Sequence, residues 1–286
     1  MKNVGPQNAV LVTLSVSRWT VHALDKEISK EIVQSKGLQG EDMCRAWKTL
    51  IPRNKFLSAI NGAASQARKF HYKNTFEWVH EGPRVLPTKN YLEYTKFMRR
   101  AKTKFEKAVE AFLKEYETLQ LAARAALNSM FKESDYPSVE SLRKKFSFST
   151  FTSELPSGAG IPQNVGAEEA GRIRADIERD LQETFRSANR DLWGRLHNVI
   201  NKMQECLSSP SGVKPRSLAS LREALALLDR LNVTGDERLE RLRKQAEERV
   251  RILSGGRECL APANKEAAIE EAERIRSSMA AFMAAA

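Results

Sequence analysis

The sequence predicts a mainly α-helical fold, an elongated helical bundle built on a long antiparallel pair of coiled-coil-like helices, with one small N-terminal hairpin. Two apolar stripes of similar length carry this prediction. The first, within residues 88–131, has spacings that alternate between four and three: Phe105, Val109, Phe112, Tyr116, Leu119, Ala123, Ala126 and Met130. That 3.5-residue period is typical of coiled coils.

The second stripe lies within residues 167–207: Ile173, Ile177, Leu181, Phe185, Ala188, Leu192, Leu196, Val199 and Met203. Two helices of equal length, joined by a flexible segment, fold back most simply as an antiparallel pair in which each buries the other's stripe. Forty residues of helix at ~1.5 Å per residue span about 60 Å, so we expect an elongated molecule. The period does not decide whether the seam forms within one chain or between chains of an oligomer.

The N-terminal segment alternates apolar and polar side chains. Val10, Val12, Leu14 and Val16 share one face, which predicts a short strand or an extended arm. Its expected partner is residues 75–88, where Gly82, Pro83 and Pro87 predict a small hairpin.

Shorter helices are predicted between and after these elements. One carries Leu24, Ile28 and Ile32 and stops at Gly37. Others are expected over residues 53–73, 139–146, 217–231, 236–253 and 263–285, with Ser217 as an N-cap and Gly255-Gly256 as a stop. Residues 147–166, rich in Ser, Gly and Pro, predict a loop or hinge. We therefore divide the chain into a basic region 1–146, the hinge 147–166 and a charge-balanced region 167–286.

Composition narrows the class of protein. With 286 residues, 41% of them hydrophobic, the chain is able to bury a sizeable core. Cys44, Cys206 and Cys259 are widely spaced and predict neither a disulfide framework nor a zinc site. The apolar run 9–16 is too short to span a bilayer. We expect a cytoplasmic protein, with no membrane contact.

The positive charge is concentrated near the N-terminus. Residues 45–107 contain fifteen Lys and Arg against four Asp and Glu, an excess equal to the net charge of +11 of the whole chain. A basic stretch interleaved with aromatic side chains favours a polyanionic partner such as DNA or RNA. The alternative partner is an acidic protein surface.

Within this stretch we select ten candidate nucleic-acid-binding residues. Cations bind phosphates, and bases stack on aromatic faces. The candidates for phosphate contact are Arg68, Lys69, Lys73, Arg99, Arg100, Lys102 and Lys104, and those for base stacking are Tyr72, Phe76 and Trp78. The competing interpretation is that the aromatic residues belong to the core and that the cations only solvate a helix face.

No motif for catalysis, metal binding or cofactor binding accompanies this stretch. The four histidines have no metal-ligand spacing, and the glycine-rich nucleotide-binding and nucleophile-elbow motifs do not occur. Asp176, Asp180, Glu183 and Asp191 alternate with arginines, which favours ion-paired helix surface. We predict no enzyme activity, no cofactor and no metal site.

Several segments resemble a helical family of phage and prophage proteins of unassigned function. They are residues 14–20 (LSVSRWT), 69–78 (KFHYKNTFEW), 84–94 (RVLPTKNYLEY), 135–137 (DYP) and 191–196 (DLWGRL). Members of that family tend to occur near a MoxR-type AAA+ ATPase and a von Willebrand factor A-type protein. The resemblance implies a location in the cytoplasm of a bacterial host and suggests an ATPase as a partner.

Two functional hypotheses follow. The first is a non-enzymatic, phage-derived protein that binds nucleic acid through its basic N-terminal surface without reading base sequence. The alternative is a helical scaffold or adaptor that docks on an AAA+ ATPase or assembles with itself through its C-terminal helices.

Overall fold

The structure is a computed structural model that describes residues 8–157, 161, 166–209, 214–254 and 262–283. Its strands are β1 (Ala9–Ser17), β2 (His22–Asp25), β3 (Ala46–Thr49), β4 (Phe76–Glu77), β5 (Arg84–Pro87) and β6 (Ser147–Glu154). Its helices are α1 (Lys26–Ser35), α2 (Lys55–Asn74), α3 (Tyr91–Lys114), α4 (Tyr116–Leu127), α5 (Val139–Arg143), α6 (Ala167–Ser208), α7 (Pro215–Leu231), α8 (Glu237–Leu253) and α9 (Pro262–Met283).

The predicted fold class is wrong because the chain also builds two β-sheets. One has four strands in the order β4-β5-β1-β6, and the other pairs β2 with β3. Strand β6 lies in the segment predicted as a hinge. There, residues 148–152 contain two Phe and two Thr, residue types that favour a strand, whereas the Gly and Pro signals all come after residue 154.

The predicted pairing of the N-terminal strand is confirmed. β1 runs antiparallel to β5, with Val10 opposite Leu86 and Leu11 opposite Val85, and β4 pairs with β5 as a hairpin. Leu11, Val85 and Leu86 are buried. The alternation of apolar residues in β1, together with Gly82 and Pro83, predicts the segment that pairs with β1, whereas the residue-by-residue register comes from the structure.

The predicted antiparallel pair of long helices is also wrong. The first helix is interrupted at Glu115 and becomes α3 and α4. Helix α4 ends at Leu127, and its cap residue Asn128 has a positive φ of 47°. The stripe of α3 is covered by aromatic side chains: the ring centroids of Phe105 and Phe148 are 5.7 Å apart, and those of Phe112 and Phe146 are 5.9 Å apart. The stripe of α6 packs instead against α7, α8 and α9.

The chain forms two compact units, each made of segments that are distant in sequence. The bundle unit comprises Met1–Thr13, His71–Thr95 and Phe151–Ala286, and the basic unit comprises Leu14–Phe70 and Lys96–Thr150. The boundaries fall within β1, α2, α3 and β6, and the one in β6 lies inside the segment 147–166. We describe each unit by itself.

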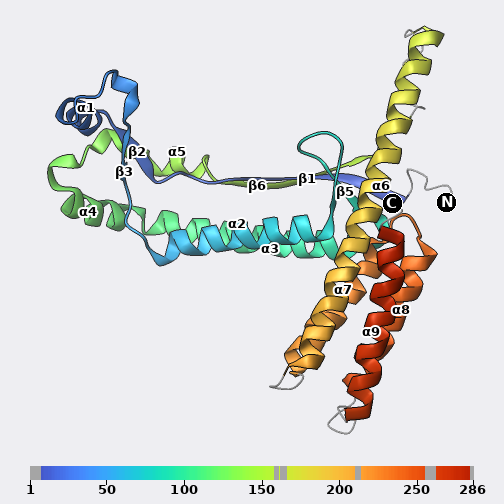
Figure 1. Ribbon diagram of the computed structural model, residues 1–286. Coiled ribbons are helices and arrows are strands. Elements are labelled where there is room, and N and C mark those ends of the chain that lie inside the picture. Colours follow the sequence, from blue (N-terminus) through green and yellow to red (C-terminus); the bar gives the residue numbers. More distant parts are fainter. Residues whose placement is uncertain (1–7, 158–160, 162–165, 210–213, 255–261, 284–286) are drawn as a thin grey trace. The chain divides into compact units, whose positions relative to one another are not determined.

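In the bundle unit, helices α6 to α9 lie side by side, and the N-terminal part of α6 extends beyond the other three (Figure 1). Leu192, Leu196 and Ile200 of α6 are fully buried. Helix α7 begins at Pro215 with Lys214 as its N-cap, so the predicted cap at Ser217 is wrong. The predicted stop at Gly255-Gly256 lies outside the described residues.

In the basic unit, α2 and α3 pack side by side (Figure 1). Ile60, Ala63, Ala64 and Ala67 form the buried face of α2. Phe70 of α2 stacks on Phe97 of α3, with centroids 3.7 Å apart and an interplanar angle of 8°. This packing fixes which face of α3 remains in solvent.

Candidate nucleic-acid interface

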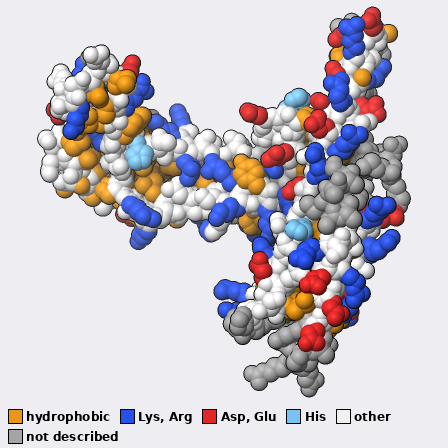
Figure 2. Space-filling view, viewed as in Figure 1, with side chains coloured by type: hydrophobic (Ala, Val, Ile, Leu, Met, Phe, Trp, Pro, Cys, Tyr) orange, Lys and Arg blue, Asp and Glu red, His pale blue; other side chains and the backbone are white. Residues whose placement is uncertain are grey.

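Almost all of the net charge belongs to the basic unit. Its residues include 22 Lys and Arg against 12 Asp and Glu, a net charge of +10, whereas the bundle unit has 25 against 24. On the face shown in Figure 2, blue and red side chains are interspersed over α6 to α9, and few red ones lie over the elements of the basic unit. The structure therefore assigns the positive field to one of the two folded units.

The cations of α3 lie opposite its buried face. Met98, Ala101, Phe105, Val109 and Phe112 are buried in the unit. Because an α-helix has 3.6 residues per turn, positions 96, 99, 100, 103, 104 and 107 lie on the other side. Four of these positions carry cations that line one surface hollow: 99, 100, 104 and 107. We define Arg99, Arg100, Lys104 and Lys107 as the α3 ridge. With Thr103 they line a shallow hollow of about 510 Å³.

Few anions neutralise this ridge. Lys104 Nζ donates a hydrogen bond to the amide oxygen of Gln66 at 3.0 Å, which is a neutral partner. Among the described residues, no ion pair involves Arg99, Arg100 or Lys107. Arg100 and Lys104 are four residues apart, a like-charge spacing that destabilises a helix by a few tenths of a kcal/mol. The ridge therefore costs stability in the free protein, and a bound anion would offset that cost.

The nearest acidic residues on α3 are already paired. Glu110 accepts hydrogen bonds from the Arg143 guanidinium of α5, one of them at 3.1 Å. These hydrogen bonds are the main reason that the pKa of Glu110 lies below its usual value. Glu106 lies 3.8 Å from Lys102. Lys102 is thus a less available cation than the sequence alone indicated.

Four candidates lie on α2, and two of them belong to the basic unit: Arg68, which has a structural contact, and Lys69, which is exposed. Arg68 Nη2 donates to the backbone oxygen of Val16 at 2.8 Å, which ties the end of β1 to α2. The Arg68 side chain is half-buried. Both residues belong to the basic unit.

The remaining four candidates belong to the bundle unit and are not part of the α3 ridge. Phe76, expected to stack on a base, is instead a core residue that is 2% exposed. Trp78 is half-buried and packs against the hydrophobic core of the bundle. Tyr72 is exposed, but the Arg84 guanidinium lies over its ring at 5.0 Å. Lys73 is exposed.

The aromatic and basic segment around these residues also includes His71, which is buried. Its Nδ1 is hydrogen-bonded to the Tyr94 hydroxyl at 2.7 Å. Burial, and secondarily the charge of Arg84, lowers the pKa of His71 to about 4, and burial raises the pKa of Tyr94. His71 is therefore neutral near pH 7 and adds no positive charge to the surface.

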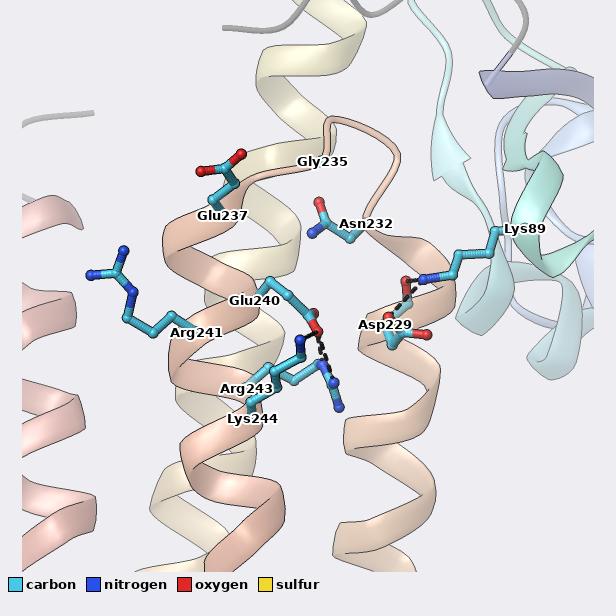
Figure 3. A pocket seen from close by; sticks show the side chains of 9 residues that line it. All are labelled: Lys89, Asp229, Asn232, Gly235, Glu237, Glu240, Arg241, Arg243 and Lys244. Atoms are coloured by element: carbon cyan, nitrogen blue, oxygen red, sulfur yellow. Dashed lines mark hydrogen bonds and ion pairs between the residues drawn. The ribbon is translucent and has the colours of Figure 1, made fainter.

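A second charged hollow, in the bundle unit, is lined by paired charges. It lies between α7, α8 and Lys89, has a volume of about 690 Å³, and is shown in Figure 3. Lys89 Nζ is 2.7 Å from Asp229 Oδ1, and the buried Arg243 binds Glu240 and Glu247 at 2.9 and 2.8 Å. Hydrogen bonds from Arg243 lower the pKa of Glu240. The Arg243 pairs lie within α8, the Lys89 pair reaches α7, and the cations in these pairs are already neutralised.

The sequence-based selection missed Lys107, which lines the ridge hollow. A helical projection of residues 96–107 against the apolar positions Met98, Ala101 and Phe105 would have included Lys107 and placed Lys102 nearer the buried side.

Within the described part of the chain, no group of three His, Cys, Asp or Glu side chains is arranged to hold a metal ion.

None of the helices in the described residues combines the length and apolarity that crossing a membrane requires. In comparisons with protein-family models, curated proteins and solved structures, nothing matches this chain.

Proposed function

We propose that this protein binds nucleic acid through phosphate contacts of the α3 ridge. The observation that carries the proposal is a row of exposed cations on the solvent face of one helix, Arg99, Arg100, Lys104 and Lys107, to which no carboxylate of the described residues is paired. Lys and Arg side chains that neutralise phosphates release condensed counterions, which supplies most of the free energy of non-specific binding.

The chemistry of the ridge favours contact with the backbone rather than with base edges. The hollow along the ridge is lined by one polar uncharged residue, Thr103, and the neighbouring amide of Gln66 already accepts a hydrogen bond from Lys104 through its oxygen. Phosphate contacts fix the position of a protein on nucleic acid without carrying sequence information. We therefore expect affinities that depend little on base sequence and strongly on salt.

The experiment measures fluorescence anisotropy of labelled oligonucleotides, single-stranded and duplex, over a range of salt concentrations. The test variant reverses the ridge with Arg99→Glu, Arg100→Glu, Lys104→Glu and Lys107→Glu. The matched control reverses four exposed arginines of α6 and α7, with Arg186→Glu, Arg190→Glu, Arg216→Glu and Arg222→Glu. Both variants change the net charge equally, so only the position of the charge differs.

We expect the ridge variant to lose binding and the control to retain most of it. In the unmodified protein, four phosphate contacts give a slope of log affinity against log salt of about −3 to −4. Lys102→Glu alone should weaken binding less than Arg100→Glu, because Lys102 already has Glu106 as a partner. Equal loss in both quadruple variants would refute the site, and a lack of binding at low salt would favour the adaptor hypothesis.

A further inference from the structure

The two-stranded β2–β3 sheet of the basic unit exposes a tryptophan on one of its two faces. The register places Leu24 opposite Trp47 and His22 opposite Thr49, so these four side chains share a face. The opposite face carries Asp25 and Lys48, both of which are buried. Trp47 is 61% exposed, although tryptophan is usually largely buried.

The backbone that carries Trp47 is held on its buried side. Lys48 Nζ lies 2.7 Å from the Asp135 carboxylate and donates to the backbone oxygen of Met130 at 2.7 Å. The amide of Ala46 donates to Ser29 Oγ of α1 at 2.9 Å. These contacts hold the backbone of β3 in place. The ring of Trp47 is therefore preorganised for a ligand, because little chain entropy is lost when a ligand binds to it.

The indole of Trp47 has no aromatic partner among the described residues. Two other large apolar side chains, in the segment between α1 and β3, are exposed: Met43 at 68% and Leu38 at 38%. Figure 2 shows hydrophobic side chains gathered over the lobe that α1, β2 and β3 form. Exposed apolar groups that gather in this way are typical of a binding surface.

A surface hollow with basic lining residues adjoins the face of the β2–β3 sheet that carries Leu24 and Trp47. It has a volume of about 440 Å³, and its lining includes Leu24, the ladder partner of Trp47. Its charged lining residues are Lys26, Lys30, Arg45 and Asp42, and Arg45 Nη2 lies 3.4 Å from Asp42 Oδ1. Lys26 and Lys30 are four residues apart on α1 and so share a face. Glu27, between them in sequence, is 2.8 Å from Lys132.

We propose that this lobe binds a single-stranded nucleic acid, with a base stacked on Trp47 and a phosphate in the hollow beside Lys26, Lys30 and Arg45. The proposal rests on the proposed function and specifies its ligand. In a duplex each base is already stacked between its neighbours, so a flat aromatic side chain selects a strand whose bases are free. The alternative occupant of the apolar surface, another protein, is an outcome of the test.

The experiment compares binding of a labelled 20-nucleotide single strand and of the matching duplex by Trp47→Ala, Trp47→Phe and the unmodified protein. Phe151→Ala is the matched control, because Phe151 is an exposed aromatic residue of the bundle unit. Thermal melts followed by circular dichroism verify that each variant is folded. Size-exclusion chromatography with light scattering reports self-association.

We expect the unmodified protein to prefer the single strand and Trp47→Ala to weaken its binding roughly 10-fold, with duplex binding unchanged. Trp47→Phe should retain part of the affinity, and Phe151→Ala all of it. If Trp47→Ala binds the single strand as tightly as the unmodified protein, or if it dissociates an oligomer instead, the platform is refuted while phosphate binding by the ridge still stands. If neither nucleic acid binds, the proposed function itself fails.

Discussion

Asp236 joins the indole of Trp193 to the start of α8. One carboxylate oxygen, Oδ2, accepts a hydrogen bond from Trp193 Nε1 at 3.1 Å. The other, Oδ1, accepts from the amides of Arg238 and Leu239 at 2.9 and 3.1 Å and so caps the helix. Trp193 lies on α6 and is 3% exposed. A single side chain therefore fixes the contact between two helices of the bundle.

Asp236→Ala should lower the free energy of unfolding by about 3 kcal/mol. Loss of the cap costs about 1 kcal/mol, and loss of the hydrogen bond between Asp236 and the buried indole N–H costs about 1–3 kcal/mol. Asp236→Asn should cost roughly half as much, because its one amide oxygen is able to serve the cap or the indole but not both. Urea unfolding monitors the difference, and equal losses in the two variants would contradict the shared role of the carboxylate.

His71 should make the bundle unit less stable in acid. Its pKa is about 4 in the folded protein and about 6.5 when unfolded, so between these values only the unfolded chain binds the proton. The stabilisation is therefore complete above pH 6.5 and is lost as the pH falls to 4, by about 3 kcal/mol in total. We expect His71→Phe to flatten the dependence of unfolding free energy on pH over this window. If the unfolding free energy of His71→Phe depends on pH as steeply as that of the unmodified protein, groups other than His71 cause the dependence.

Lys48 should be essential for the stability of the two-stranded β2–β3 sheet. Its side chain is 3% exposed, and its ammonium lies between the carboxylates of Asp135 and Asp25, at 2.7 and 3.7 Å. Lys48→Met leaves two carboxylates facing each other and should cost about 3–5 kcal/mol. The triple variant Lys48→Met, Asp25→Asn and Asp135→Asn should recover much of this loss, since it removes the uncompensated charges. Thermal unfolding tests both variants, and a triple variant less stable than Lys48→Met would contradict this account.

Two glycines in helix interiors should be replaceable by alanine. A Cβ at Gly62 of α2 or at Gly171 of α6 would meet no atom within 4 Å, and neither residue has a positive φ. Gly62→Ala should raise the free energy of unfolding by about 0.5–1 kcal/mol. Hydrogen exchange and urea unfolding of each variant measure the effect, and a destabilised Gly62→Ala would show strain that these contacts do not reveal.

Gly171→Ala should act more locally. No side chain of residues 171–183 is fully buried, and the ion pairs there, such as Arg172 with Glu168 and Arg179 with Asp176, are exposed. This part of α6 is stabilised mainly by its own helical hydrogen bonds. We therefore expect Gly171→Ala to slow amide exchange in residues 167–183 and to leave global unfolding nearly unchanged.

The local elements could be predicted because their signals are local. The 3.6-residue period of α6, the alternation in β1 and the Gly82-Pro83 turn each reflect steric and hydrogen-bonding preferences within a few residues. The concentration of cations on α3 is likewise visible in the sequence. These features gave the helices, one strand pairing and most of the ridge residues.

The partner of each apolar face was decided only by the tertiary structure. An apolar stripe specifies burial but not what covers it, so the α6 stripe equally suited α3 or the helices α7 to α9 that occupy it. For the same reason the sequence could not separate Phe76, which is buried, from Trp47, which is exposed. Hydrophobic burial is non-directional, and the identity of the covering surface emerges only when all elements compete for it.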